Sequence, residues 1–241
     1  MIQLQQFSVT YPGASQAALH PTNLQFSTGE MVVLLGTSGA GKSTLLRSIN
    51  GLNAASSGEL LINGKKLEGE RPLRQHRLDC AMIFQQHQLL PKRTALQNVL
   101  LGRLGYYSSL RSLLPMSRAD KELALQCLER VGLLDKALER CDRLSGGQQQ
   151  RVGIARALAQ QPKVILADEP VASLDPVTAQ QVLTLLHDIC QTDGITAIVS
   201  LHQLELAKPF AQRIIGLNQG KVVYDGPPEN LHDSLVSSIY Q

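Results

Sequence analysis

The chain has 241 residues and a formal net charge of +3, with 43% hydrophobic and 18% charged residues. This length and balance are typical of one α/β domain that has room for an inserted subdomain, and they exclude a disordered or low-complexity chain. The weak positive charge, without a dense lysine and arginine stripe, does not indicate nucleic-acid binding. The apolar runs fall short of the ~18 residues that suggest a membrane span, and strand-like sequence directly after Met1 predicts that there is no secretory signal.

The cysteines are far apart in the sequence and form no CxxC pair; they are Cys80, Cys127, Cys141 and Cys190. This spacing favours reduced thiols in a cytosolic protein over a disulfide framework.

The first stretch of the chain predicts two strands. Apolar residues alternate over residues 2–11, and Gln5 and Gln6 interrupt the alternation where a bulge fits. The Tyr-Pro-Gly sequence at residues 11–13 predicts a turn, and alternation over residues 22–28 predicts the second strand.

A glycine-rich run follows the next strand. Residues 31–35 are all apolar, as in a strand buried on both faces, and residues 44–49 indicate a helix. The run between them fits the P-loop pattern, in which backbone N–H groups at a helix N-terminus surround phosphates. The predicted ATP-binding residues are Gly36, Thr37, Ser38, Gly39, Ala40, Gly41, Lys42, Ser43 and Thr44.

Within this run, Lys42 is expected to reach the β- and γ-phosphates, and the hydroxyl of Ser43 is expected to bind Mg²⁺. The alternative is a glycine-rich turn without a ligand. The preceding strand, the spacing, the lysine and the serine together favour the P-loop.

Helical patterns dominate the middle of the chain. Residues 58–65 predict a strand that ends in an Asn-Gly turn, and residues 80–84 predict a buried strand. From residue 86 to residue 160 we expect a helical subdomain inserted between core strands, in which Ser117 and Asp120 fit a capping box.

A second glycine pair begins a long helix in this region, in the run Leu144, Ser145, Gly146, Gly147 and Gln148. Ser145 and Gln148 fit a capping box, and the glycines leave backbone N–H groups bare beside the serine hydroxyl. From local physics, an anion site and an ordinary capped helix are equally good interpretations.

Two carboxylates follow the apolar strand at residues 164–167. Ligands of open parallel sheets bind beyond the carboxyl ends of the strands, so Asp168 is placed to hold Mg²⁺ together with Ser43. Glu169 is placed to orient or deprotonate an attacking water. The alternative is a solvated acidic turn, which the strand and the upstream P-loop disfavour.

The last third of the chain continues the α/β pattern. Asp175 and Pro176 predict the start of a helix, and residues 195–201 predict a buried strand. A lone histidine is usually a surface group, but His202 follows this strand at the expected phosphate end, which favours a γ-phosphate contact. The sequence then predicts a hairpin around residues 214–224 and a short helical tail at residues 228–241.

Taken together, these motifs resemble the ATP-binding subunit of an ABC transporter, in the family's order and over essentially the whole chain. The resemblance implies an α/β fold of the ABC ATPase type, a P-loop NTPase with a RecA-like core, an antiparallel β part and an inserted helical subdomain. It implies one domain over residues 1–241, with residues 1–85 and 161–241 as the nucleotide-binding core and residues 86–160 as the helical subdomain.

The resemblance also implies roles for single residues. Tyr11 stands where the family stacks adenine, although packing in its turn explains this residue nearly as well. Catalytic roles fall on Glu169, His202 and Gln85, and Mg²⁺ would bind to Ser43, Gln85 and Asp168. A D-loop is implied at Ser173, Leu174 and Asp175, and a signature that acts on the nucleotide of a second copy is implied at Leu144, Ser145, Gly146, Gly147 and Gln148.

A finer similarity is to the ATPases of phosphonate importers. It rests on residues 104–111, 168–176 and 200–203. It implies a head-to-tail dimer that binds ATP at the cytoplasmic face of the inner membrane. The dimer would act with permease subunits and a periplasmic or surface substrate-binding protein, and without nucleic acid. The uptake of phosphonate or a related small oxyanion is the expected function.

Several alternatives stay open from the sequence. The chain could serve an importer of another small polar substrate or a soluble phosphonate-degrading complex. An ABC ATPase of nucleic-acid repair or translation is disfavoured because the chain has neither a long coiled-coil insertion nor a second ATPase domain. A nucleotide-gated scaffold without turnover is disfavoured because Glu169 and His202 are both present.

Overall fold

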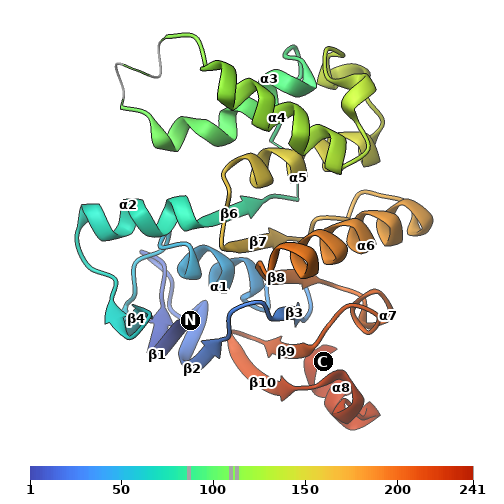
Figure 1. Ribbon diagram of the computed structural model, residues 1–241. Coiled ribbons are helices and arrows are strands. Elements are labelled where there is room, and N and C mark those ends of the chain that lie inside the picture. Colours follow the sequence, from blue (N-terminus) through green and yellow to red (C-terminus); the bar gives the residue numbers. More distant parts are fainter. Residues whose placement is uncertain (86–87, 109–110, 112–113, 241) are drawn as a thin grey trace.

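The computed structural model describes residues 1–85, 88–108, 111 and 114–240. Two β-sheets and a set of helices make up the fold (Figure 1). The predicted start of the helical subdomain at residue 86 and part of the string at residues 104–111 lie outside the described residues. The division into a nucleotide-binding core and a helical subdomain stays a prediction.

The first sheet is antiparallel, with the strand order β2-β1-β4-β5. Its strands are β1 (Ile2–Val9), β2 (Leu19–Phe26), β4 (Ser57–Ile62) and β5 (Lys65–Lys66). The predicted bulge is confirmed, because the register of β1 shifts after Leu4 and Gln6 has a φ of 46°. Gly58 lies opposite this bulge, where a Cβ would lie 2.1 Å from the carbonyl oxygen of Gln6.

β2 begins three residues before the predicted start at residue 22 and ends at Phe26. It includes Pro21, which has no N–H to donate, but β2 is an edge strand of its sheet, where a proline is tolerated.

The second sheet has the strand order β10-β9-β3-β8-β7-β6, and all its pairs except β10 with β9 are parallel. Its strands are β3 (Met31–Leu35), β6 (Cys80–Ile83), β7 (Val164–Asp168), β8 (Thr196–Leu201), β9 (Arg213–Asn218) and β10 (Lys221–Gly226). The expected antiparallel and parallel β parts are therefore confirmed.

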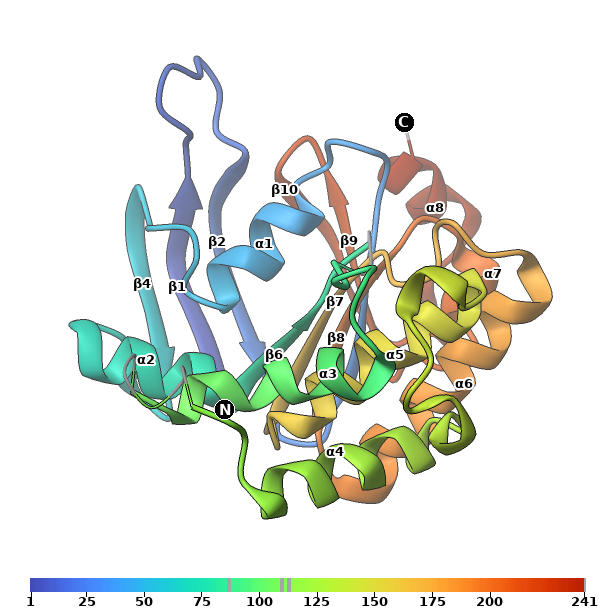
Figure 2. The same ribbon diagram turned by 90° about the horizontal axis from the view of Figure 1, so that it is seen from above.

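The central strands of this second sheet are buried on both faces. On β3, Val32 and Leu34 face one hydrophobic cluster, while Met31, Val33 and Leu35 face another. The first cluster packs the parallel sheet against α1 (Lys42–Ile49) and the antiparallel sheet, and Figure 2 shows α1 between the two sheets. This position fixes the N-terminus of α1 beside the carboxyl end of β3.

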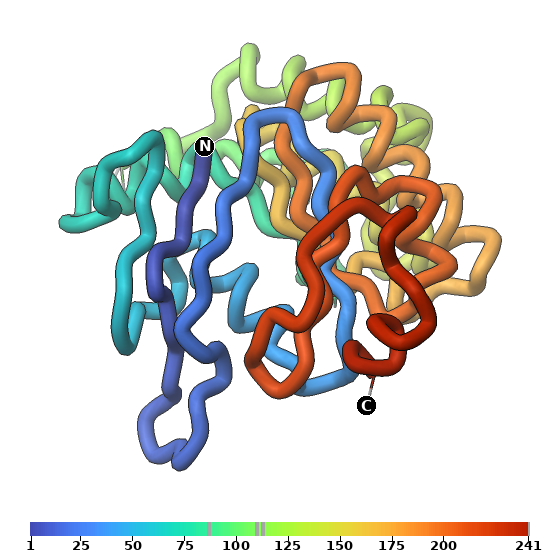
Figure 3. Tube along the Cα trace, turned by 90° about the horizontal axis from the view of Figure 1, so that it is seen from below, coloured from blue at the N-terminus to red at the C-terminus, as the bar shows by residue number. Residues whose placement is uncertain are grey.

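Helices cover the other face of the parallel sheet: α5 (Gly146–Ala159) packs against β6 and α6 (Pro176–Asp193) against β8, and α3 (Ala95–Leu100) and α4 (Arg118–Arg130) pack on α5 (Figure 1). The remaining helices are α2 (Glu70–Asp79), α7 (Leu204–Ala207), α8 (Asp233–Tyr240) and the short 3₁₀ turns η1 (Leu101–Tyr106), η3 (Leu134–Lys136), η4 (Cys141–Arg143) and η5 (Pro228–Asn230). Figure 3 shows the N-terminus and α8 on different sides of the molecule. Within the described residues, no helix is both long and apolar enough to cross a membrane.

The predicted capping box at Ser117 forms only in half. The Ser117 hydroxyl accepts a bond from the backbone N–H of Asp120 and caps α4. The Asp120 carboxylate instead accepts bonds from Arg103 Nε at 2.8 Å and from the Tyr107 hydroxyl. It therefore joins η1 to α4. Burial raises the pKa of Asp120, but the bonds from Ser117, Tyr107 and Arg103 outweigh burial and lower this pKa to about 2.

This carboxylate makes stability depend on pH. The pKa of Asp120 is lower in the folded chain than in the unfolded chain, so its stabilisation is full above about pH 4 and is lost as the pH falls toward about 2. We predict that Asp120→Asn lowers the free energy of unfolding by about 2 kcal/mol at pH 7, and that this difference shrinks below pH 4. Urea unfolding at several pH values measures it, with the exposed Asp135→Asn as the control. A loss that stays the same at every pH would contradict the prediction.

Candidate functional site

The carboxyl ends of β3, β7 and β8 lie side by side, because Leu35 pairs with Leu201 and Asp168 pairs with Ser200. The residues that follow these strands therefore meet at one edge of the sheet. They form a pocket of about 400 Å³. Its lining residues are Ala18, Ser38, Gly39, Ala40, Gly41, Lys42, Ser43, Thr44, Gln85, Glu169 and His202.

The loop after β3 leaves the N-terminus of α1 open to an anion. Gly41 is the N-cap residue, with a φ of 102°, and it has no side chain to cap the helix. A Cβ here would lie 2.8 Å from the carbonyl oxygen of Ala18, so the close approach of these two backbones requires glycine. The first N–H groups of α1 have no acceptor within the helix, and they face the pocket at the positive end of its dipole.

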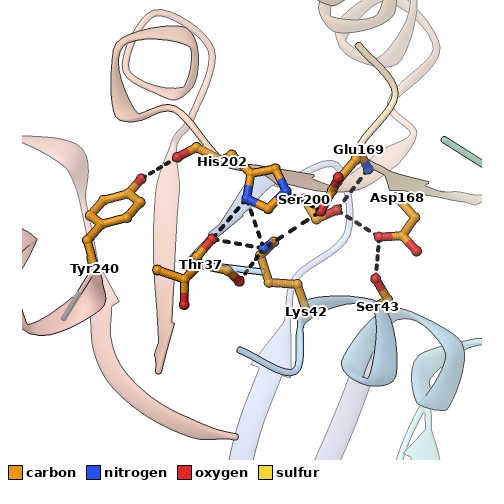
Figure 4. A network of polar contacts seen from close by, with 9 residues as sticks. Thr37, Lys42, Ser43, Asp168, Glu169, Ser200, His202 and Tyr240 are labelled. Carbon is orange, nitrogen blue, oxygen red and sulfur yellow. Dashed lines mark hydrogen bonds and ion pairs between the residues drawn. The ribbon is translucent and has the colours of Figure 1, made fainter. Parts of the chain in front are cut away.

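Lys42 places a buried cation at the centre of the site (Figure 4). Its Nζ donates to the carbonyl oxygens of Gly36 at 2.8 Å and Thr37 at 3.0 Å, and lies 3.8 Å from Glu169 Oε1. Burial lowers the pKa of Lys42, while the carboxylates of Glu169 and Asp168 act in the opposite direction. Further negative charge in the pocket would favour the ammonium form.

A chain of oxygen atoms connects the P-loop to β7 and β8. The hydroxyls of Ser43 and Ser200 donate to Asp168 Oδ1 at 2.8 Å and 3.0 Å, and the backbone N–H of Glu169 donates to the Ser200 hydroxyl at 2.9 Å. Serine and carboxylate oxygens are hard ligands of the kind that Mg²⁺ prefers when phosphates supply the rest of its shell. The donor set formed by Ser43 and Asp168 therefore fits this metal.

Glu169 and His202 contact each other at the mouth of the pocket, with 2.6 Å between His202 Nε2 and Glu169 Oε1 (Figure 4). His202 Nδ1 lies 3.2 Å from the carbonyl oxygen of Gly36, so the ring links Glu169 to the P-loop. Glu169 has a φ of 49°, in the left-handed region that residues other than glycine rarely adopt. Backbone strain of this kind is concentrated at functional sites.

Two predicted residues lie at the edges of this site. Gln85 is exposed and lines the pocket. Tyr11 is 39% exposed, and its hydroxyl lies 3.2 Å from the hydroxyl of Thr44 and accepts a bond from Asn53. Tyr11 therefore lies beside α1, and its stacking on adenine stays a prediction.

The glycine pair of the signature lies on another part of the chain. Of the described residues that line the P-loop pocket, none comes from the run Leu144, Ser145, Gly146, Gly147 and Gln148. The predicted capping box is confirmed: Ser145 and Gln148 bond reciprocally at the start of α5.

The signature packs against the predicted D-loop, which consists of Ser173, Leu174 and Asp175. A Cβ on Gly147 would lie 2.5 Å from Thr178 Cγ2, and one on Gly146 would lie 3.3 Å from Leu174 Cδ2. Asp175 caps α6 as expected, and hydrogen bonds from Thr178 lower its pKa. The glycines therefore allow the start of α5 to lie close to the start of α6.

Sequence reasoning missed two residues of the site. Ala18 lines the pocket from the segment before β2, and Ser200 connects Asp168 to the backbone of Glu169. Ser200 is the second-last residue of its strand, and only the register between β7 and β8 brings it opposite Asp168. The signal available in the sequence was that two predicted strands both end in polar residues.

A family model for the ABC transporter matches residues 19–172, more than half of the chain. A phosphonates import ATP-binding protein of Nostoc sp. (PhnC 3) is 57% identical over 241 residues, which cover 100% of this chain and 92% of that protein. A phosphite import ATP-binding protein of Stutzerimonas stutzeri (PxtA) is 58% identical over 240 residues, which cover 100% of this chain and 87% of that protein.

Solved structures agree with this match. The dimeric, post-hydrolysis structure of the ATP-binding cassette MJ0796 bound to ADP and Pi has a TM-score of 0.82 and 37% identity, covering 95% of this chain and 99% of that one. The ADP conformation of the cassette MJ1267 has a TM-score of 0.86 and 26% identity, covering 98% of this chain and 97% of that one. The predicted fold of the ABC ATPase type is confirmed.

The position of Lys42 leads to a direct test of the pocket. We predict that Lys42→Ala weakens ATP binding by about 10- to 100-fold, because a charged donor to the phosphates is lost. Titration with a fluorescent ATP analogue measures the dissociation constant. The control is Lys221→Ala, which removes an exposed lysine close to the P-loop. The residue before it, Gly220, donates its backbone N–H to the carbonyl oxygen of Ala40 in that loop. Equal affinity in wild type and Lys42→Ala would remove Lys42 from the phosphate site.

Proposed function

The chain belongs to the ABC transporter family as an ATP-hydrolysing subunit, and we propose that it powers the uptake of phosphonate or a related small phosphorus oxyanion. The observation that carries the hydrolytic role is the cluster of Lys42, Ser43, Asp168, Glu169 and His202 around one pocket. The choice of cargo is supported by the relatives, whose names are those of phosphonate and phosphite import proteins.

In this proposal the P-loop binds the triphosphate of ATP. The open N-terminus of α1 and the Lys42 ammonium bind the β- and γ-phosphates. Ser43 and Asp168, with Gln85, would hold Mg²⁺, which neutralises charge on the phosphates when bound. Tyr11 would contact the adenine from its place beside Thr44.

The hydrolytic step is assigned to Glu169. Its carboxylate takes a proton from a water molecule whose oxygen attacks the γ-phosphorus, and the bond to the β-phosphate oxygen breaks, leaving ADP and phosphate. His202 contacts Glu169 at 2.6 Å and would also contact the γ-phosphate. The strained backbone of Glu169 and its bond to Ser200 support this role, because they hold the carboxylate in one direction.

A second copy would complete the site. The signature residues lie away from the P-loop pocket of their own chain, and the start of α5 carries N–H groups on Gly146 and Gly147. Two chains related by a two-fold axis would each bring this helix start to the γ-phosphate of the other. The D-loop, next to the signature, would lie at the same interface. ATP then stabilises the closed dimer, and hydrolysis releases it.

A groove near the helical part supports the docking of a membrane permease. It has a volume of about 550 Å³ and is lined by Glu70, Leu73, Arg74, Arg77, Leu78, Leu101, Gly102, Gly105 and Gln160. Apolar and charged residues together suit an amphipathic segment of another chain. The protein would then work at the cytoplasmic face of the inner membrane, with a periplasmic or surface binding protein delivering the cargo.

The function is tested by reconstituting the chain with the permease and binding protein of its own system in vesicles. We expect ATP hydrolysis to increase when the loaded binding protein is added with methylphosphonate or phosphite, and labelled cargo to enter the vesicles. Hydrolysis that responds to an amino acid or a sugar and not to either oxyanion would overturn the choice of cargo.

We predict that Glu169→Gln keeps ATP binding but lowers kcat by at least about 100-fold, because the proton acceptor is lost. The trapped ATP should also convert the chain to a dimer, measured by light scattering with and without ATP. The control is Glu129→Gln, an exposed glutamate on α4. Undiminished hydrolysis would remove Glu169 from the role of base.

We predict further that Ser145→Arg keeps ATP binding to single chains but abolishes both hydrolysis and ATP-dependent dimerisation, because a bulky cation replaces the cap of α5 at the interface. Equilibrium binding, phosphate release and light scattering measure the three properties. Gln181→Arg, an exposed position on α6, adds the same charge elsewhere. Turnover at the wild-type rate would contradict an active site shared between two copies.

A further inference from the structure

The C-terminal helix contacts the catalytic histidine. We propose that Tyr240, at the end of α8, is a positioning residue that holds His202 for ATP hydrolysis. Its hydroxyl donates to the backbone carbonyl oxygen of His202 at 2.8 Å (Figure 4). This inference rests on the proposed hydrolytic role of His202.

His202 needs support from outside the pocket. It follows the last residue of β8 and precedes α7, and its side chain is 38% exposed, so packing alone does not fix the ring. The ring contacts Glu169 at Nε2, and its Nδ1 lies 3.2 Å from the carbonyl oxygen of Gly36 and 3.4 Å from Lys42 Nζ. All of these contacts are to the proposed catalytic site itself.

These contacts involve groups that take part in the proposed reaction. Glu169 gains a proton when water attacks, which weakens its attraction for the ring, and Gly36 belongs to the loop that binds the phosphates. The Tyr240 hydroxyl donates a hydrogen bond to the backbone of His202, and the strength of this hydrogen bond does not depend on the protonation of Glu169. It therefore holds the histidine throughout a catalytic cycle.

The helix that carries Tyr240 is anchored independently of the site. Ile239 is fully buried and packs on Gly216 of β9, where a Cβ would lie 2.5 Å from Ile239 Cδ1. Asn218 Nδ2 donates to the carbonyl oxygen of Ser238 at 2.8 Å. Both contacts fasten α8 to the parallel sheet, so the position of the hydroxyl is set by the core of the protein.

The hydroxyl acts as a donor at neutral pH. Burial raises the pKa of Tyr240, and the negative charge of Glu205 raises it further, so the phenol keeps its proton. A backbone carbonyl oxygen only accepts, so the direction of this hydrogen bond is fixed.

The test is Tyr240→Phe, which keeps the ring and removes the hydrogen bond. The matched control is Tyr224→Phe: Tyr224 is also half-buried, and its hydroxyl donates to the carbonyl oxygen of Pro227 at 2.5 Å, away from the pocket. We expect Tyr240→Phe to lower kcat about fivefold with KM and ATP affinity unchanged, and Tyr224→Phe to leave all three unchanged. Thermal unfolding of both variants checks that each is folded.

A cycle with His202→Ala separates positioning from a general loss of stability. If Tyr240 acts through His202, then Tyr240→Phe has no further effect on single-turnover hydrolysis in the His202→Ala chain. An equal fold-loss in both backgrounds would overturn the inference. So would wild-type kcat in Tyr240→Phe.

The result also separates this inference from the function on which it rests. A wild-type chain that hydrolyses no ATP, alone or with its permease, would overturn the proposed function and this inference together. Normal wild-type turnover with an unaffected Tyr240→Phe variant would overturn only the role of Tyr240. If Tyr240→Phe unfolds at a lower temperature, single-turnover hydrolysis of Tyr240→Phe and Tyr224→Phe is compared at a temperature at which both variants are fully folded, and that comparison decides the question.

Discussion

The buried ammonium of Lys42 is the interaction around which the site is built. A charge taken out of water is costly unless it is paired, and here the carbonyl oxygens of Gly36 and Thr37 and the carboxylate of Glu169 surround it. Gly36 and Thr37 belong to the same loop as Lys42. Glu169, in contrast, reaches Lys42 only because β3 and β7 flank β8 in one parallel sheet and end at the same edge. The fold therefore supplies negative partners for this cation, and the triphosphate of the proposed function would supply stronger ones.

The helices differ in whether a side chain caps their first backbone N–H groups, and this difference bears on their proposed roles. α3, α4, α5 and α6 each begin with a side chain that accepts from the backbone, whereas α1 begins at Gly41 without a cap. In the proposed function, an anion in the P-loop would act as the missing cap for α1. At α5 the cap is Ser145 itself, so in the proposed dimer the γ-phosphate would meet a helix start that is already rigid.

Much of this arrangement could be predicted from local patterns. The apolar run of β3, the capping box of α5 and the Asp-Pro start of α6 each depend on residues close in sequence, and all are confirmed. The polar helix α2 was missed, because His76 is its one buried residue and no apolar stripe reveals it. The start of β2 was also missed, because Pro21 is unusual in a strand. β2 is an edge strand, and an edge strand tolerates a proline. The hydrogen bond from Arg103 to Asp120 could not be predicted either, because capping rules consider only residues close in sequence and this bond is a tertiary contact.

The contacts of His202 show why such features lie beyond sequence reasoning. Its ring meets Gly36 across 166 positions of the chain, and its carbonyl oxygen meets Tyr240 across 38. No local motif encodes either contact, because each arises from how β8 lies beside β3 and how α8 packs on β9. A motif identifies the histidine as a candidate, whereas its direction is set by the sheet on one side and by the C-terminal helix on the other. In the proposed mechanism a shift of α8 along β9 would move the histidine relative to Glu169, so the rate of hydrolysis would depend on packing far from the nucleotide.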